Sequence, residues 1–135
     1  MSRARRKNRN RKGIAAVECA VVLPILLLVI AATLDICNLI FLRQQLTVAA
    51  YEGARVAINP NSGLDDIESQ VRTILDQRGI VVEEIGVTPE DFESSEFGTA
   101  IEVSISANVS KNTAFNGVFA NDKVVISSMT MMKEQ

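Results

Sequence analysis

Residues 13–34 read GIAAVECAVVLPILLLVIAATL, and this stretch decides how the chain is organised. The run 19–34 carries no charge, and apolar residues continue to Leu42. A helix needs about 20 mainly apolar residues to cross the hydrocarbon core of a bilayer. The stretch therefore predicts a transmembrane helix over 14–42.

The residues before Gly13 are strongly basic. Seven of them are Lys or Arg and none is acidic, whereas the chain from Ile14 onward has seven basic and sixteen acidic residues. A basic arm can bind nucleic acid by releasing counterions from phosphates. Lys and Arg beside an apolar span, however, mark its cytoplasmic side. We favour this second interpretation, which predicts a lipid-inserted, single-pass protein with its N terminus inside, its C terminus outside and no nucleic-acid partner.

The span is predicted to stay in the membrane and not to be removed as a secretory signal. Its apolar region is longer than that of a typical signal peptide, and Val48-Ala49-Ala50 comes too late to serve as a cleavage site. Cys19 and Cys37 lie about 27 Å apart on one helix, so they cannot form a disulfide within the chain. Both are interpreted as small apolar residues of the span.

Glu18 is a carboxylate just inside the start of the apolar stretch. A charged side chain in a span costs about 2.5–3.5 kcal/mol on insertion scales, so such a residue usually has a partner or a function. The simpler alternative is that Glu18 extends its carboxylate to the membrane interface.

Several stretches resemble a known family. The order of Gly13, four uncharged residues and Glu18 resembles the cleavage motif of type IV prepilins and pseudopilins. The stretches 15–24, 45–55 and 128–134 resemble the TadE-like family of tight-adherence pseudopilins. Two positions differ: Cys19 stands where the family often has an aromatic residue, and Asp35 where it often has glutamate.

The resemblance implies processing. Prepilin peptidase, an inner-membrane aspartyl peptidase, would cut after Gly13 on the cytoplasmic side and leave Ile14 as the first residue. Glu18 would then be the fifth mature residue. An ammonium and a carboxylate are each poorly tolerated alone in a low-dielectric bundle. Glu18 is therefore predicted to pair with the new α-amine of a neighbouring subunit, and we favour this assembly role over the interfacial one.

The resemblance also implies a function and a location. The chain would be a minor pseudopilin of a tight-adherence pilus or type II-related secretion system. It would sit in the inner membrane, with its exported domain in the periplasm, outside the cell or in a pilus. Its partners would be other pilin or pseudopilin subunits and the inner-membrane assembly platform. The alternative is an unprocessed single-pass membrane protein whose exported domain binds an envelope partner.

Pro24 lies inside the predicted span. Proline removes the hydrogen bond to the carbonyl four residues back, that of Ala20, and predicts a kink or local melting. In a pilus-like bundle such a joint would let the helix adjust, whereas in a simple anchor it would be tolerated. Both interpretations stay open.

The first helix is predicted to continue beyond the membrane over 43–58 and to end at the turn cluster Asn59-Pro60-Asn61-Ser62-Gly63. Ala49, Gly53 and Ala57 recur every four residues on this part. Such a ridge of small residues permits close helix approach. It can serve a neighbouring helix, the chain's own domain, or both.

Residues 1–13 are predicted to be a basic leader. Residues 59–135, at the other end of the chain, are predicted to form a small exported α+β domain. An apolar stripe predicts a second amphipathic helix, with Ser62 and Asp65 as a weak capping box and Gly79 as its stop. Thr88-Pro89 is predicted to open a short helical piece. The β-prone segments 80–87, 101–109 and 123–132 predict an antiparallel sheet of about three strands. The stripe comprises Leu64, Ile67, Val71, Ile74 and Leu75.

Enzyme chemistry is not predicted. The sequence contains no histidine, which excludes a Ser-His-Asp triad and a histidine metal site. The acidic residues between 83 and 96 lack the spacing of an EF-hand loop and are interpreted as a solvated face. We predict no catalytic residue, no metal and no cofactor.

Overall fold

The computed structural model describes the backbone of residues 7–112 and 123–133, and the side chains in these ranges from Gly13 onward. The contacts divide the chain into two units, Met1–Leu34 and Asp35–Gln135. Each unit is considered by itself. Residues 1–6 of the predicted basic leader lie outside the described residues, and residues 7–12 are described by their backbone alone.

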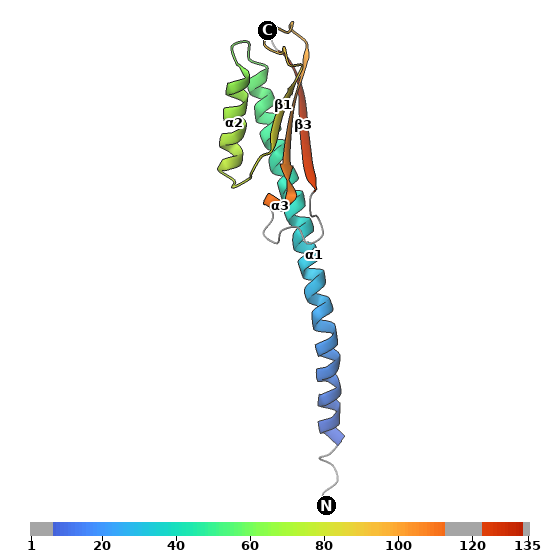
Figure 1. Ribbon diagram of the computed structural model, residues 1–135. Coiled ribbons are helices and arrows are strands. Elements are labelled where there is room, and N and C mark those ends of the chain that lie inside the picture. The colour runs from blue at the N-terminus through green and yellow to red at the C-terminus, as the bar shows by residue number, and fades with distance from the viewer. Residues whose placement is uncertain (1–6, 113–122, 134–135) are drawn as a thin grey trace, which may run out of the picture. The chain divides into compact units, whose positions relative to one another are not determined.

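Helix α1 runs from Lys7 to Ala57 and covers both the predicted span and its continuation (Figure 1). It begins before the expected start at Ile14. A helix satisfies its backbone hydrogen bonds internally, which is required of a segment in lipid. The helix ends where Ser62 N–H donates to Asn59 O in a turn around Pro60.

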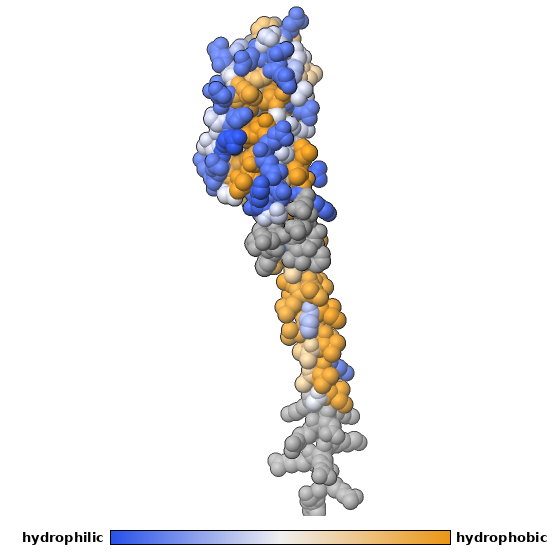
Figure 2. Space-filling view, viewed as in Figure 1, coloured by the Kyte–Doolittle hydropathy of each residue, from blue (hydrophilic) through white to orange (hydrophobic). Residues whose placement is uncertain are grey.

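In the first unit, the side chains from Gly13 to Ile30 are all exposed, and Leu28 is 65 % exposed. The viewed face of this segment is almost entirely hydrophobic (Figure 2). A helix that is apolar on all sides is typical of a membrane span. Within the described residues, Gly13–Ala57 is the helical segment long and apolar enough to cross a membrane. The chain thus has an N-terminal apolar helix compatible with single-pass membrane anchoring.

The second unit contains helix α2, Leu64–Asp76, whose buried face is formed by Ile67, Val71 and Leu75. The predicted capping box at Ser62 and Asp65 is wrong by one position. Gly63 is the N-cap, and its N–H donates to Asp66 Oδ2 at 3.0 Å. The side chain of Asp66 thus satisfies a backbone donor at the helix start.

The predicted stop of α2 at Gly79 is confirmed. Gly79 has a φ of +67°, a conformation that glycine adopts without the steric cost of a Cβ atom. Beyond it, Ile80 N–H donates to Leu75 O, which satisfies one of the last helix carbonyls.

Three strands form the predicted antiparallel sheet: β1, Glu84–Thr88; β2, Ala100–Asn108; and β3, Val124–Met132. Their order is β1-β2-β3, and both neighbouring pairs are antiparallel. A single helical turn, α3, follows β2 over Val109–Asn112. The α+β fold class is confirmed.

The first strand begins at Glu84, later than the predicted start at Ile80. The reason is that the side chain of Asn112 hydrogen-bonds to both backbone polar groups of Val81. Val81 N–H donates to Asn112 Oδ1 at 2.7 Å, and Asn112 Nδ2 donates to Val81 O at 2.9 Å. The amide thus replaces a strand partner. The second strand also ends at Asn108, because Val109 begins α3.

The core of the second unit lies where the inner face of the sheet meets α2 and the Asp35–Ala57 part of α1. Thr47 on α1 and Ser127 on β3 share a hydrogen bond of 2.8 Å between their hydroxyl oxygens, which also ties these elements together. The largest fully buried side chains are Leu42, Leu46, Ile67, Leu75, Ile101, Ile105, Val71, Val103 and Val109.

The predicted short helical piece after Thr88 is wrong, because residues 89–95 form successive turns. Phe92 N–H donates to Pro89 O, and Ser95 N–H donates to Phe92 O. The buried Lys133 also contacts this segment. Its Nζ donates to the carbonyls of Phe92, Glu93 and Ser95 at 2.9, 2.9 and 3.0 Å. One ammonium thus holds these turns against the end of β3.

Lys133→Met is expected to destabilise the second unit by about 2 to 3 kcal/mol, because three carbonyls lose a charged donor. Thermal unfolding of the full chain in detergent, followed by circular dichroism, measures the effect. Lys123→Met is the matched control, since Lys123 is exposed at the other end of β3, and its effect is expected to stay within about 0.5 kcal/mol. Equal effects of the two variants would contradict the assignment.

Candidate functional site

The predicted processing residues lie on the exposed part of α1. Gly13 is helical, and apart from its chain neighbours and the backbone of its own helix, no described atom lies within 4 Å of the position that a Cβ would take there. The next residue, Ile14, is 60 % exposed. A larger side chain at Gly13 therefore meets no neighbour in this structure. Substitution there can be used to test cleavage without disturbing the packing of the described residues.

Glu18 is also exposed on α1, in the turn that follows Ile14. In the described part of the chain, ion pairs join Glu52 with Arg55, Glu68 with Arg72 and Glu83 with Lys111, and none includes Glu18. Its carboxylate is accessible on a segment whose surroundings are apolar side chains. The exposed carboxylate of Glu18 is therefore accessible to a second subunit, as the predicted pairing requires.

Pro24 lies in the middle of the same segment, and α1 continues through it without a break. The residues on both sides of Pro24 are helical and exposed. The carbonyl of Ala20 loses its usual donor because proline has no N–H. The predicted kink at Pro24 stays a prediction.

The small residues Ala49, Gly53 and Ala57 lie in the core of the second unit. Ala49 is 0 % and Ala57 is 1 % exposed. A Cβ built on Gly53 would be 2.8 Å from Val71 Cγ2 on α2 and 3.3 Å from Val103 Cγ1 on β2. These residues permit α1 to approach its own α2 and sheet. This was one of the two interpretations that the spacing allowed.

Sequence reasoning gave no function to Asp35, which is only 6 % exposed at the start of the second unit. Its Oδ1 and the Oε1 of Gln45 have no hydrogen-bond partner within the described part of the chain. An unsatisfied buried acceptor costs about 1 to 3 kcal/mol. The signal in the sequence was that Asp35 ends the uncharged run of the span.

Metal or acid–base chemistry finds no support among these residues. Within residues 7–112 and 123–133, no group of three or more His, Cys, Asp or Glu side chains could hold a metal ion. Among the described side chains of residues 13–34, Glu18 is the one charged residue, and Cys19 lies next to it on α1.

The comparison with known families covers the same part of α1. Residues 13–55 match the TadE-like protein family. The match begins at Gly13 and includes Glu18, Pro24 and Gly53, so the resemblance predicted from the motif is confirmed over this segment. We call residues 13–55 the TadE-like segment. The residues beyond Arg55, which carry α2 and the sheet, lie outside the match.

No curated protein and no solved structure matches the chain. The functional proposal therefore rests on the TadE-like segment and on how the structure places its residues. The segment includes the exposed apolar helix of the first unit and the start of the core helix in the second.

Proposed function

We propose that the chain is a minor pseudopilin of a tight-adherence pilus or a related secretion system. It is processed by prepilin peptidase and acts as a structural or assembly component, not as an enzyme. One observation carries the proposal: the TadE-like segment begins at Gly13 and has Glu18 in register on an exposed apolar helix.

The charge distribution supports an orientation. The basic residues before Gly13 favour the cytoplasmic side of the membrane. The part of the chain beyond the span has more acidic than basic residues, so it lacks the excess of Lys and Arg that would hold it in the cytoplasm. In the proposed topology, the chain crosses the inner membrane once, with residues 14–42 in lipid and residues 59–135 in the periplasm or beyond. Residues 43–58 continue α1 outside the bilayer and join the exported core.

Cleavage after Gly13 creates the proposed assembly site. It gives Ile14 a free α-amine, which is largely protonated near neutral pH. A bundle of such helices has low polarity, so the amine of one subunit is best placed beside the Glu18 carboxylate of another. The partners in this proposal are prepilin peptidase, pilin-like subunits and the assembly platform.

The mature protein is expected to begin at Ile14. Its intact mass, measured after extraction from membranes of cells with active prepilin peptidase, should lack residues 1–13. Gly13→Leu should keep the full mass, because the peptidase reads the residue before the cut and the structure leaves room for the new side chain. Ala15→Leu, two positions away on the same exposed helix, is the control and should still be cleaved.

If the native protein keeps residues upstream of Gly13 in such cells, the pseudopilin proposal is wrong. The alternative is then an unprocessed membrane protein whose exported domain binds an envelope partner. The N-terminal residue therefore separates the two functions directly.

A further inference from the structure

The start of the second unit has apolar side chains on the outside and a carboxylate on the inside. Ile36 is 59 %, Ile40 is 53 % and Phe41 is 54 % exposed, whereas Asp35 is only 6 % exposed. The opposite is usual in water, where a carboxylate is almost never buried without a partner. In a membrane, charged side chains turn toward the protein and away from lipid. These turns of α1 therefore have the arrangement of a surface that faces lipid.

The length of the first unit gives a second argument. Its uncharged run, Cys19–Leu34, has sixteen residues and extends about 24 Å as a helix. The hydrocarbon core of a bilayer is about 30 Å thick, so about 6 Å of it must be crossed by residues beside this run. On one side the next residue is the charged Glu18. On the other side the exposed side chains stay uncharged from Ile36 to Phe41, so lipid is expected to cover the start of the second unit.

The end of the sheet lies at the same level as these turns of α1. Within the second unit, β3 runs in the same direction as the Asp35–Ala57 part of α1 (Figure 1), and Ser127 on β3 hydrogen-bonds to Thr47 on α1. Val124 precedes Ser127 by about 10 Å of strand, and the same distance back from Thr47 is about seven residues of helix. Val124 is therefore level with Phe41. It is itself 48 % exposed.

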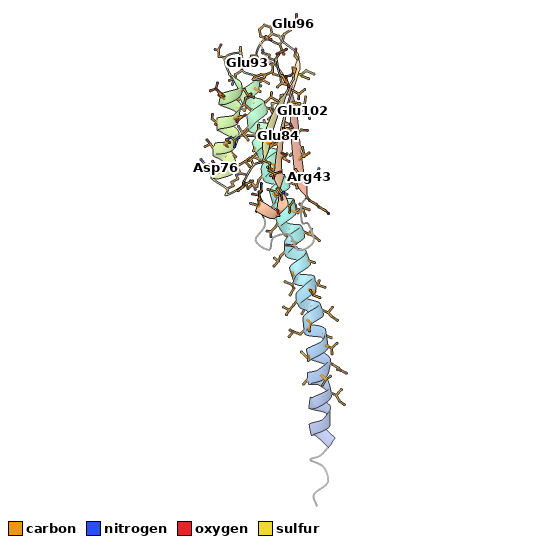
Figure 3. The ribbon with its side chains drawn as sticks, in the orientation of Figure 1. Arg43, Asp76, Glu84, Glu93, Glu96 and Glu102 are labelled. Atoms are coloured by element: carbon orange, nitrogen blue, oxygen red, sulfur yellow. The ribbon has the colours of Figure 1, made fainter. Side chains whose placement is uncertain are left out.

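Charged residues limit how far the second unit can enter the membrane. Arg43 on α1 and Lys123 before β3 are exposed, and such side chains extend their charges to the membrane interface. Asp76 at the end of α2 lies toward the same end of the unit as Arg43 (Figure 3). Glu93 and Glu96 lie at the opposite end (Figure 3). The end near Asp35 can thus reach the lipid headgroups, but the rest of the unit stays outside the bilayer.

We propose that the second unit docks on the lipid bilayer through exposed apolar side chains at its Asp35 end, which we call the docking surface. These side chains lie at the boundary between the acyl chains and the headgroups, and Arg43 donates to lipid phosphate oxygens. Lipid is the partner because Asp35 follows directly on the apolar helix of the first unit, which brings this end to the membrane. The proposal rests on the proposed single crossing of the membrane. The docking surface comprises Ile36, Ile40, Phe41 and Val124.

The native Cys37, an exposed residue in the same turns of α1, tests whether lipid covers them. The full chain with Cys19→Ala is placed in nanodiscs of phosphatidylcholine and phosphatidylglycerol, with one chain in each disc. A water-soluble maleimide is expected to label Cys37 about tenfold more slowly than it labels an exposed control, because the reactive thiolate does not form in lipid. The control is Tyr51→Cys in a Cys19→Ala, Cys37→Ala background, since Tyr51 is 46 % exposed and lies about 21 Å further along α1.

Fluorophores at the two ends of β3 test whether the sheet reaches the membrane. Val124→Cys and Met132→Cys, each in the background without Cys19 and Cys37, are labelled and placed in nanodiscs with a quencher on the lipid headgroups. The probe at Val124 is expected to lose at least about half of its fluorescence, because it lies within the boundary of roughly 5–10 Å that interfacial side chains occupy. The probe at Met132 lies about 26 Å further along β3 and should lose little.

A charge in the docking surface should weaken the docking. Phe41→Glu is expected to reduce the quenching of the probe at Val124, because a carboxylate is poorly tolerated in lipid. Tyr51→Glu, on the same helix outside the docking surface, is the matched control and should leave the quenching unchanged. Circular dichroism of each variant shows whether it is folded.

Three results would overturn the proposal: equally fast labelling of Cys37 and of the Tyr51→Cys control, equal quenching at the two ends of β3, or equal effects of Phe41→Glu and Tyr51→Glu in folded proteins. Protection of Cys37 that appears only in discs with two chains would also overturn it, because a second copy would then cover the surface.

Leu26→Cys, in the exposed helix of the first unit, separates failure of the docking from failure of the membrane anchor. If Leu26→Cys is protected from the maleimide and Cys37 is not, the anchor stands and the docking is wrong. If both are labelled, the single crossing is wrong, and the docking with it. The intact mass of the native protein reports cleavage before Ile14 separately, so failure of the docking does not count against the pseudopilin function.

Discussion

Gly53→Val is expected to unfold the second unit, Asp35–Gln135, without changing the apolar helix of the first unit. The first added atom would already lie 2.8 Å from Val71 Cγ2 and 3.3 Å from Val103 Cγ1. Valine side chains are stiff, because branching at Cβ restricts χ1. We expect a cost of about 3 kcal/mol, at the upper end of the usual range for overpacking. A domain this small has little stability to lose.

The measurement is a denaturation curve of the full chain in detergent, combined with protease resistance of residues beyond Ala57. Glu52→Ala is the matched control, because Glu52 lies next to Gly53 on α1 and makes only a 3.9 Å ion pair with Arg55. It is expected to shift stability by less than about 0.5 kcal/mol.

A double-mutant cycle gives the sharper test. Gly53→Ala gains about 1 kcal/mol of helix propensity but brings its methyl group against Val71. In a Val71→Ala background this contact is absent, so Gly53→Ala should become favourable. A coupling of at least about 1 kcal/mol is expected. Additive effects would show that α1 does not approach α2 through Gly53.

The ridge around Gly53 shows what sequence alone could establish and what it could not. The spacing of Ala49, Gly53 and Ala57 correctly indicates a close approach, because small residues on one helix face remove the steric barrier. The spacing does not identify the approaching element, because a neighbouring helix and the chain's own α2 would both require small residues at these positions. The structure places Val71 and Val103 there, but both are far from Gly53 in sequence.

Elements set by local patterns were predicted well. The alternation over 101–109 predicted β2, and the apolar run predicted α1. Elements set by long-range polar contacts were missed. The start of β1 depends on the side chain of Asn112, and the turns after Thr88 depend on Lys133. Neither partner is marked by any periodicity. The pairing of Glu18 belongs to the same class, because its proposed partner is on another molecule.

Glu18→Gln is expected to insert and to be cleaved after Gly13, but to lose association with other pilin-like subunits. Removing a charge from the span eases insertion. In the assembled bundle, however, the α-amine of a neighbouring subunit is then left without its carboxylate. Breaking one side of a buried ion pair is strongly unfavourable, so association should fall by about tenfold or more. Glu18→Ala should act similarly, and Glu18→Asp should be intermediate because the charge stays but the reach shortens.

The experiment compares co-purification or crosslinking of cleaved, membrane-inserted subunits, with the intact mass measured in each sample. Glu52→Gln is the control, since it removes a carboxylate from the same helix outside the predicted span. It should leave association unchanged. Gly13→Leu, scored in parallel, should also weaken association, because the uncleaved chain has no amine at Ile14. If Glu18→Gln associates as well as the native protein while cleavage is intact, the carboxylate does not pair with the amine. Its function would then be limited to recognition by the peptidase or to the membrane interface.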